Sequence, residues 1–414
     1  MGKAISGVRD NMEVPFEGYA NAFNILREPL NNRESFNKYY VIREHSPVAE
    51  LVQRMTMDKR NSKIAFIGQR GAGKTTELLR IKYELEDVYF GVYFSVQDII
   101  EPGRIDRVDL LMAISLSIWR EALARGVTVD KSIVEDYTSW LREVTKLPED
   151  ARKDILHQAK LNDLIKKAMG KMRLETVSHK EINEKVATRC YELLEKTNTL
   201  ILDLEEKTKK KVVILIDDLD KVQMDASEAL REWTTNTKLL KCKIIYVMPI
   251  SILAIGGARE FDKVMHVPVP PIKDLKGFDL AIMDELKDMV MKRLPLDYLE
   301  PNALSHLVAK TGGVLSDLFW CASECCSRAA MKNLPKIDQK VAEEVVEDLK
   351  LRYRRMLSSA DAEALSKMKS GRLESIRLPE LMSSQMVIEY SSKDGTRFWH
   401  EIHPLVQELL SERI

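Results

Sequence analysis

The chain has 414 residues, which is long enough for two or three domains. Lysine plus arginine and aspartate plus glutamate both total 64, so no overall charge draws the protein to nucleic acid or to an anionic membrane. The N-terminus lacks an apolar run of signal-peptide length and no later run could span a bilayer, which predicts an ordinary globular protein without a membrane partner.

The first part of the chain contains apolar strands between helices. Residues 1–45 are polar, and we expect them to be irregular. A helix with one apolar face is predicted at 46–57, apolar strands at 64–68 and 88–96, and a further helix at 107–124. This order is typical of an α/β layer.

A charged stretch at 130–207 then reads as helical. Ser178 and Glu181 match a capping box at the start of one of its helices. A buried stripe is predicted along that helix, formed by Ile182, Val186, Cys190, Leu193 and Ile201.

Three more strands follow at 211–220, 242–250 and 263–272. Their apolar residues do not alternate with polar ones, as expected for strands buried on both faces of a parallel sheet. From about 275 to 357 the pattern is helical throughout. The last stretch, 375–414, predicts a helix, two strands around the turn Lys393-Asp394-Gly395, and a helix, which is the outline of a winged helix.

The predicted fold class is therefore α/β, with a parallel five-stranded sheet covered by helices on both faces. An all-α lid and a winged-helix domain follow it. The expected division is an N-terminal extension at 1–45, a nucleotide-binding domain at 46–274, a lid at 275–350 and a winged helix at 351–414.

The five cysteines do not have the spacing of a metal site. Cys321, Cys325 and Cys326 form the only cluster, with no histidine beside them in the sequence. We expect small buried thiols in a reducing, cytoplasmic compartment.

A phosphate-binding motif, Gly-x4-Gly-Lys-Thr, lies between a predicted strand and a predicted helix. Its glycines let successive backbone N–H groups point at a phosphate, and the following helix adds its positive end. Lys74 is placed to bridge the β- and γ-phosphates, and the Thr75 hydroxyl to bind Mg²⁺. The candidate nucleotide-binding residues here are Gly68, Gln69, Arg70, Gly71, Ala72, Gly73, Lys74, Thr75 and Thr76.

An acidic motif, "VVILIDDLD", complements the phosphate loop. Four apolar strand residues bring Asp217 to the carboxyl edge of the sheet, where a carboxylate can hold the metal through water. Asp218 is the candidate for orienting the attacking water. Asp220 is better explained as a solvated loop acid. Together the two motifs predict binding of ATP or ADP with Mg²⁺ and slow hydrolysis.

The order of these parts resembles the AAA+ superclass, in particular the branch with origin-recognition ATPases and STAND switches (signal-transduction ATPases with numerous domains). The likeness covers about 36–414. It implies that 130–207 is an insertion, which is either a partner surface or purely structural. A small-molecule kinase is disfavoured, because a lid and a winged helix have no purpose there.

Individual residues match further motifs of this family. Val41 and Arg43 resemble the hydrophobic residue and the arginine that line the adenine pocket. Gly312 and Gly313 resemble the glycine pair that opens a lid helix facing the nucleotide. An arginine often follows that pair, but here Ser316 or Asp317 has its place, which disfavours a motor.

His403, in "EIHPLVQELL", resembles the histidine of STAND switches that holds bound ADP by its β-phosphate. The family's acidic residue after it is replaced by Pro404. The alternative is an ordinary histidine of an amphipathic helix. Arg259 resembles the intersubunit arginine finger, and a surface-loop arginine is the equally open alternative.

The resemblance thus implies a nucleotide-dependent regulatory ATPase that self-assembles and works with a separate sensor or effector, as in prokaryotic defence or signalling systems. The alternative is a DNA-associated AAA+ ATPase that uses its winged helix on nucleic acid. The helix before the wing has few basic side chains for the major groove. A solvated helix face explains the earlier basic residues, which are Arg352, Arg354, Arg355, Lys367, Lys369 and Arg372. Nucleic acid is therefore a possible partner but not the favoured one.

Overall fold

A computed structural model of the chain describes residues 10–99, 105, 107–145, 182–222, 226–274, 277–369 and 377–412. Ser178 and Glu181, the predicted capping box, lie outside these ranges. The chain forms two compact units, which are described separately. One contains Met1–Pro47, Gly68–Leu79 and His266–Ile414, and the other contains Val48–Ile67 and Arg80–Met265.

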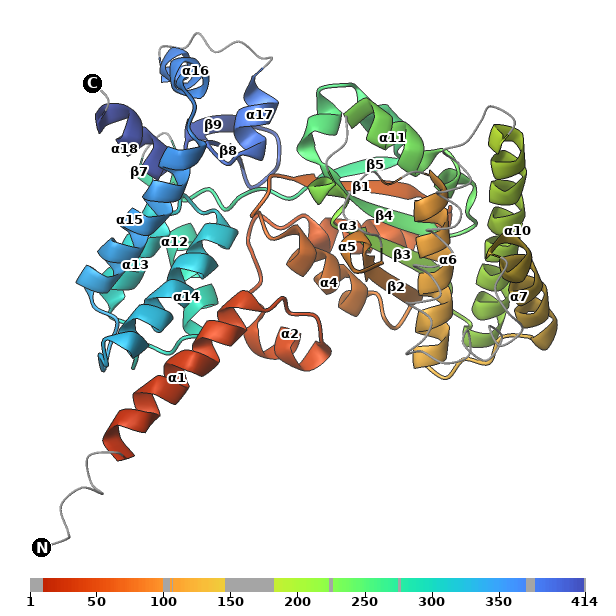
Figure 1. Cartoon of the computed structure of the whole chain (residues 1–414), viewed down its shortest axis with the longest axis horizontal. Coiled ribbons are helices and arrows are strands. Elements are labelled where there is room, and N and C mark those ends of the chain that lie inside the picture. The colour runs from red at the N-terminus through yellow and green to blue at the C-terminus, as the bar shows by residue number, and fades with distance from the viewer. Residues whose placement is uncertain are drawn as a thin grey trace, which may run out of the picture. The chain divides into compact units, whose positions relative to one another are not determined.

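The second unit is built on a five-stranded parallel sheet (Figure 1). Its strands are β1 (Lys63–Gly68), β2 (Tyr89–Ser95), β3 (Lys211–Asp217), β4 (Lys243–Pro249) and β5 (Lys263–His266), in the order β2-β3-β4-β1-β5. β2 and β3 pair in parallel from Tyr89 opposite Lys211 to Ser95 opposite Asp217. Every residue of β1 is buried, as are all but the first of β3, which explains their continuous apolar runs. The predicted fold class, α/β with a parallel five-stranded sheet and helices, is confirmed.

Helices pack on this sheet around a large apolar core. They are α3 (Val48–Met57), α5 (Val96–Ile99), α6 (Arg107–Ala124), α7 (Lys131–Thr145), α10 (Ile182–Thr208) and α11 (Ala226–Thr234). α6 contacts β2, and α10 contacts β3 and α6. Of the predicted stripe, Cys190, Leu193 and Ile201 of α10 are buried, while the side chains of Ile182 and Val186 lie outside the description. Trp233 of α11 is fully buried and donates its indole N–H to the carbonyl of Ile105 at 3.0 Å. None of the helices in the described ranges is long and apolar enough to cross a membrane.

The first unit is mostly helical. Its helices α12 (Leu280–Met291), α13 (Pro301–Lys310), α14 (Leu315–Met331) and α15 (Gln339–Met356) form the helical region expected after the sheet. α13 and α14 both pack on α15 (Figure 1). All five cysteines of the chain are free and buried, as predicted. Burial raises the pKa of the Cys326 thiol to about 12, which keeps it protonated.

The expectation that residues 1–45 are irregular is wrong. The described part of this stretch contains α1 (Asp10–Arg27) and α2 (Arg33–Tyr39), and α1 packs along α14. The reason is an apolar stripe at helical spacing, since Tyr19, Ala22 and Leu26 are each at most 5% exposed. Polar residues around this narrow stripe concealed it in the sequence.

The C-terminal part of the same unit has the predicted order of elements. α16 (Ser359–Lys369) and α17 (Leu378–Ser383) precede β8 (Val387–Ser391) and β9 (Phe398–Ile402), which pair antiparallel, and α18 (Pro404–Glu412) follows. The turn between the strands is where the sequence placed it, with Gly395 in a left-handed conformation at φ +65°.

Candidate functional site

The candidate residues fall into two groups. The phosphate loop, Val41, Arg43, Gly312 and His403 belong to the first unit, together with the N-terminal half of α4 (Lys74–Glu84). Asp217, Asp218 and Arg259 belong to the sheet unit.

The phosphate loop begins where β1 ends, at Gly68, and leads into α4 at Lys74. Gly71 and Gly73 are left-handed, at φ +79° and +86°, a conformation that only glycine adopts without strain. Lys74 is 6% exposed, and its ammonium donates to the carbonyls of Gly68 and Gln69, both at 2.9 Å. This curled backbone at a helix N-terminus, with a buried lysine, fits a phosphate group. Thr75 lies in the first turn of α4, as its predicted role requires.

The side chain of Gln69 ties this loop to the C-terminal strands. Its amide N–H₂ donates to the carbonyl of Met382 at 2.8 Å and to that of Val387 at 2.5 Å. Its carbonyl oxygen accepts from the backbone N–H of Glu389 at 3.1 Å. With both amide protons and the oxygen paired and only 2% of the residue exposed, Gln69 is fixed against β8.

The lid also contacts the loop. The N–H of Leu315, the first residue of α14, donates to the carbonyl of Gly71 at 3.0 Å. The Gln385 side chain donates to the carbonyl of Arg70 at 3.1 Å and to the Ser316 hydroxyl at 3.2 Å. A side chain at Gly71 would collide with that hydroxyl, so the loop and the start of α14 fit closely. Ser316 therefore takes part in the packing of α14 on the loop.

Arg43 and Glu77 are buried charges beside the loop. Arg43 donates to the carbonyl of Ala72 at 2.7 Å and to that of Pro268 at 2.6 Å, and its guanidinium lies 4.0 Å from the Glu77 carboxylate. Glu77 also accepts from the Tyr40 hydroxyl at 3.1 Å. The Arg43 Nε has no hydrogen-bond partner although it is buried. The segment around Arg43 is therefore anchored to the loop through charge-assisted bonds.

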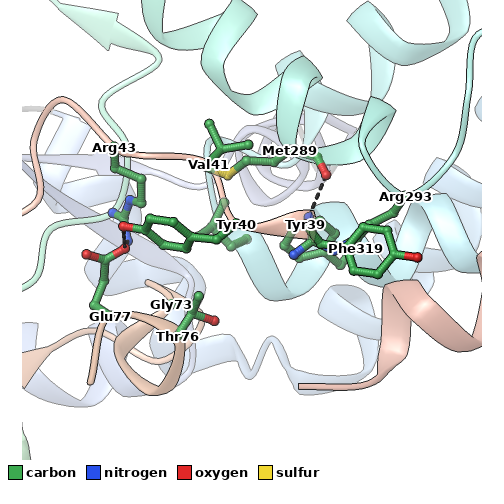
Figure 2. Close-up of a pocket in the computed structure, with 11 residues that line it drawn as sticks. Tyr39, Tyr40, Val41, Arg43, Gly73, Thr76, Glu77, Met289, Arg293 and Phe319 are labelled. Carbon is green, nitrogen blue, oxygen red and sulfur yellow. Dashed lines mark hydrogen bonds and ion pairs between the residues drawn. The ribbon is translucent and has the colours of Figure 1, made fainter. Parts of the chain in front are cut away.

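A pocket opens between this segment, the loop and the lid (Figure 2). Val41 and Arg43 both line it, as the sequence suggested, and Gly73 and Thr76 contribute the loop side. The other lining residues are Tyr39, Tyr40, Glu77, Met289, Arg293, Leu315 and Phe319. An apolar and aromatic wall with a few polar groups is typical of small-molecule sites in general. The sequence gave no sign of the lid residues, apart from the helical i, i+4 spacing of Met289 and Arg293.

Arg293 is a second buried cation, at the end of the pocket away from Glu77 (Figure 2). Its guanidinium donates to the carbonyl of Met289 at 2.6 Å and lies over the rings of Phe319 and Tyr39, 4.7 and 5.8 Å from their centroids. Burial lowers its pKa to about 10, so it remains charged at neutral pH. Cation–π contacts partly replace its lost hydration.

Gly312 and Gly313 are both left-handed, at φ +62° and +78°. The carbonyl of Gly312 accepts from the Tyr390 hydroxyl at 2.7 Å, and a side chain at Gly312 would collide with Ile388 and Pro404. The glycine pair thus allows close packing on the C-terminal elements. Its predicted contact with the nucleotide stays a prediction.

His403 is completely buried. Its ring lies on that of Tyr353, with centroids 4.4 Å apart, and its Nδ1 accepts from the N–H of Leu405 at 3.3 Å. Its Nε2 lies 3.5 Å from Asp317, whose carboxylate also accepts from the Tyr353 hydroxyl at 2.6 Å. These neighbours are those of a core histidine, and the role of His403 on a diphosphate stays a prediction.

Glu389 of β8 links three segments of the first unit. Its side chain is 3.2 Å from the His266 Nε2 and 2.9 Å from the His400 Nε2, while its backbone N–H is bound to Gln69. Burial alone would raise the pKa of this carboxyl, but the hydrogen bonds with His266 and His400 outweigh burial and lower the pKa to about 2.

In the sheet unit, Asp217 is the last residue of β3 and Asp218 follows it, and both carboxylates accept hydrogen bonds from neutral donors. Asp217 accepts from the Tyr93 hydroxyl at 3.0 Å and from the N–H of Asp218 at 2.8 Å. Asp218, left-handed at φ +66°, accepts from the Ser95 hydroxyl at 2.7 Å and lies 2.5 Å from the Lys221 ammonium. In the described ranges no cluster of three or more histidine, cysteine or acidic side chains could hold a metal. The Asp217 carboxylate is by itself an oxygen ligand of the kind that Mg²⁺ takes, because Mg²⁺ keeps several waters and needs only one or two carboxylates.

Arg259 lies in the short 3-10 helix η4 (Gly257–Glu260) of the sheet unit. Its role as an intersubunit finger stays a prediction.

No protein-family model matches the sequence, and no match was found among curated proteins. Solved structures align over most of the chain. The Thermotoga maritima RuvB Holliday junction branch migration motor is 12% identical, with 94% of this chain and 98% of that chain covered and a TM-score of 0.39. A chain of Drosophila ORC bound to DNA is 11% identical (95% and 91% covered, TM-score 0.43), and Cdc6p from Pyrobaculum aerophilum is 13% identical (92% and 98%, 0.40). Values this low assign neither a family nor a function.

The lowered pKa of Glu389 predicts a pH-dependent stability. Its folded pKa of about 2 lies below the ordinary 4.5, so its stabilisation is complete above pH 4.5 and is lost as the pH falls towards 2. Between these limits the unfolding free energy of the wild type should fall by up to about 3 kcal/mol more than that of Glu389→Gln.

Denaturant unfolding at several pH values measures this difference. Glu401→Gln is the matched control, because Glu401 lies in the same hairpin and pairs with Lys273 at 3.7 Å. Parallel pH profiles for the wild type and Glu389→Gln would contradict the prediction.

Proposed function

We propose that the protein is an AAA+-type ATPase of the STAND kind, which binds ATP or ADP with Mg²⁺, hydrolyses ATP slowly and acts as a nucleotide-dependent switch. The observation that carries the proposal is the Gln69 side chain, which joins the phosphate loop to α17 through one hydrogen bond and to β8 through two. A loop so connected cannot change its shape without affecting the C-terminal elements.

The residues of the loop have distinct parts in nucleotide binding. Backbone N–H groups of 69–75 and the start of α4 hold the phosphates. The Lys74 ammonium leaves the carbonyls of Gly68 and Gln69 and binds the phosphates instead. The pocket beside Val41 and Arg43 takes the base. Thr75 and Asp217 hold Mg²⁺, which neutralises charge on the phosphates when bound. Asp218 orients the attacking water, and Arg259 supplies a guanidinium upon self-assembly.

The switch follows from the paired contacts of the loop. If ATP binds tightly only to a rearranged loop, its binding weakens the hydrogen bonds of Gln69 and of the Gly71 carbonyl, and so favours release of β8 and α14. ADP binds without this rearrangement, so the hydrogen bonds stay intact. His403, with Asp317 and Tyr353, stabilises the same closed arrangement from the start of α18. Release would expose surface for self-assembly and for a separate effector or sensor, as in prokaryotic defence or signalling systems.

The alternative is a DNA-associated ATPase with a winged helix on nucleic acid. Two of the basic residues that would serve it have acidic partners in the first unit. Arg354 pairs with Glu412 at 2.6 Å, and Lys367 pairs with Glu363 at 2.9 Å. α17 is short, and its only charged residue is Glu380. These contacts favour the switch, and the last experiment of this section includes duplex DNA as a separate test.

The first prediction from this proposal concerns Lys74. Lys74→Ala removes a buried positive charge from the loop and should reduce the affinity for ATP and ADP by at least about tenfold. Titration of a fluorescent nucleotide measures the affinity. Lys340→Ala, which changes an exposed lysine of α15, is the control and should bind like the wild type. Equal affinity of Lys74→Ala and the wild type would refute nucleotide binding by this loop.

The two aspartates should differ in their effects. Asp217→Asn should weaken nucleotide binding in Mg²⁺ but not in EDTA, because the carboxylate holds the metal. Asp218→Asn should leave binding in both conditions unchanged and slow hydrolysis roughly a hundredfold. Binding assays and phosphate-release assays separate the two, and reversed phenotypes would mean that the roles are exchanged.

The switch itself is tested at Gln69. Gln69→Leu leaves the carbonyls of Met382 and Val387 and the N–H of Glu389 without this partner, which should shift the closed-to-open ratio at least about tenfold. ADP should then leave faster, and ATP should promote assembly more readily. Stopped-flow release of a labelled ADP and light scattering measure both.

Gln339→Leu is the matched control, since Gln339 is a half-buried glutamine of α15 that bonds only to Glu343 among the contacts described. The same measurements with duplex DNA test the alternative. Equal ADP release from wild type and Gln69→Leu, together with salt-sensitive DNA binding that stimulates hydrolysis, would replace the switch by a DNA-associated ATPase.

A further inference from the structure

Tyr93 of β2 contacts the acidic motif from the neighbouring strand. The register places Tyr93 opposite Leu215, two residues before Asp217. The Tyr93 hydroxyl donates to Oδ2 of Asp217 at 3.0 Å, while the N–H of Asp218 donates to Oδ1 at 2.8 Å. Each oxygen of the carboxylate therefore has its own donor. Because one donor comes from β2 and the other from the residue that follows β3, the plane of the carboxylate cannot rotate freely.

Tyr93 has two further contacts. The Lys82 ammonium lies 5.9 Å from its ring centroid, and the Arg120 side chain donates to its backbone carbonyl at 3.4 Å. The phenol itself is a neutral donor on a strand of the sheet. It fixes the direction of the Asp217 lone pairs without neutralising the negative charge.

Other tyrosines of the sheet do something different. The Tyr246 hydroxyl of β4 bonds to the Thr237 hydroxyl at 2.7 Å, and the Tyr89 hydroxyl donates to the carbonyl of Met55 at 2.6 Å. Both partners are neutral groups of the protein core. Tyr93 differs because its partner is a carboxylate at the carboxyl end of a central strand, where ligands of α/β sheets bind.

We propose that Tyr93 is a positioning residue for metal binding: its hydroxyl orients the Asp217 carboxylate towards the hydrated Mg²⁺ of the nucleotide. The proposal rests on the nucleotide-binding function proposed above. A side chain that orients a metal ligand, without touching the metal, controls affinity because the ligand no longer has to be ordered upon binding.

The test is Tyr93→Phe, which keeps the ring and removes only the hydroxyl. The affinity for a fluorescent ATP analogue is measured in Mg²⁺ and in EDTA, for the wild type and the variant. The gain in affinity that Mg²⁺ provides should fall about tenfold or more in the variant, and the affinity in EDTA should not change.

Two further variants show whether the effect is specific to the Tyr93 hydroxyl. Tyr246→Phe removes a buried hydroxyl of the same sheet and should keep the full gain from Mg²⁺. In the Asp217→Asn background, Tyr93→Phe should have no additional effect, because the hydroxyl acts through that carboxylate. Half-saturation of the nucleotide complex by Mn²⁺, followed by electron paramagnetic resonance, gives a readout that needs no turnover.

The outcomes distinguish a failure of the nucleotide-binding function from a failure of the role of Tyr93. If the wild type shows no gain from Mg²⁺, the nucleotide-binding function and the role of Tyr93 both fail. If the wild type shows the gain and Tyr93→Phe shows the same gain, only the role of Tyr93 is overturned. If Tyr93→Phe and Tyr246→Phe reduce the gain equally, the hydroxyl stabilises the sheet and positions nothing.

Discussion

A buried side-chain amide needs partners for two N–H donors and one oxygen acceptor. At Gln69 this requirement connects the phosphate loop to the C-terminal elements of the first unit. Its three partners are backbone groups at Met382, Val387 and Glu389. An unpaired buried polar group costs about 1–3 kcal/mol, so breaking all three contacts without replacement is expensive. The conformation of the phosphate loop and the position of β8 are therefore coupled.

Three buried charged groups of this unit follow the same principle, and a buried charge without a partner costs more free energy than a neutral polar group. Arg43, Glu77 and Arg293 are charged side chains with less than a tenth of their surface exposed. Each is retained by specific bonds: Arg43 to carbonyls on both sides, Glu77 to Tyr40, and Arg293 to Met289 and two rings. Burial of charge is tolerable only where bonds of this kind replace water. These three side chains are the charged groups of the pocket lining.

Much of the fold could be predicted because it depends on local patterns. The five strands are continuous apolar runs, and the loop from Gly68 to Thr75 is a motif whose glycines are required by its backbone. The N-terminal helix was missed, since its stripe at Tyr19, Ala22 and Leu26 is narrow. The partners of Gln69 and the lid residues Arg293 and Phe319 could not be predicted, because these contacts arise from tertiary packing that no local spacing encodes.

The distance in sequence between Gln69 and Glu389, 320 residues, also has a consequence for biosynthesis. Ribosomes add about 5–20 residues per second, so the loop waits between about 15 seconds and one minute for its last partner to emerge. During that time the amide of Gln69 has no β8 to bind, while the sheet residues up to Met265 are already available to fold. A nascent chain would thus contain an incomplete phosphate loop until Glu389 has been synthesised, however early the rest of the loop forms.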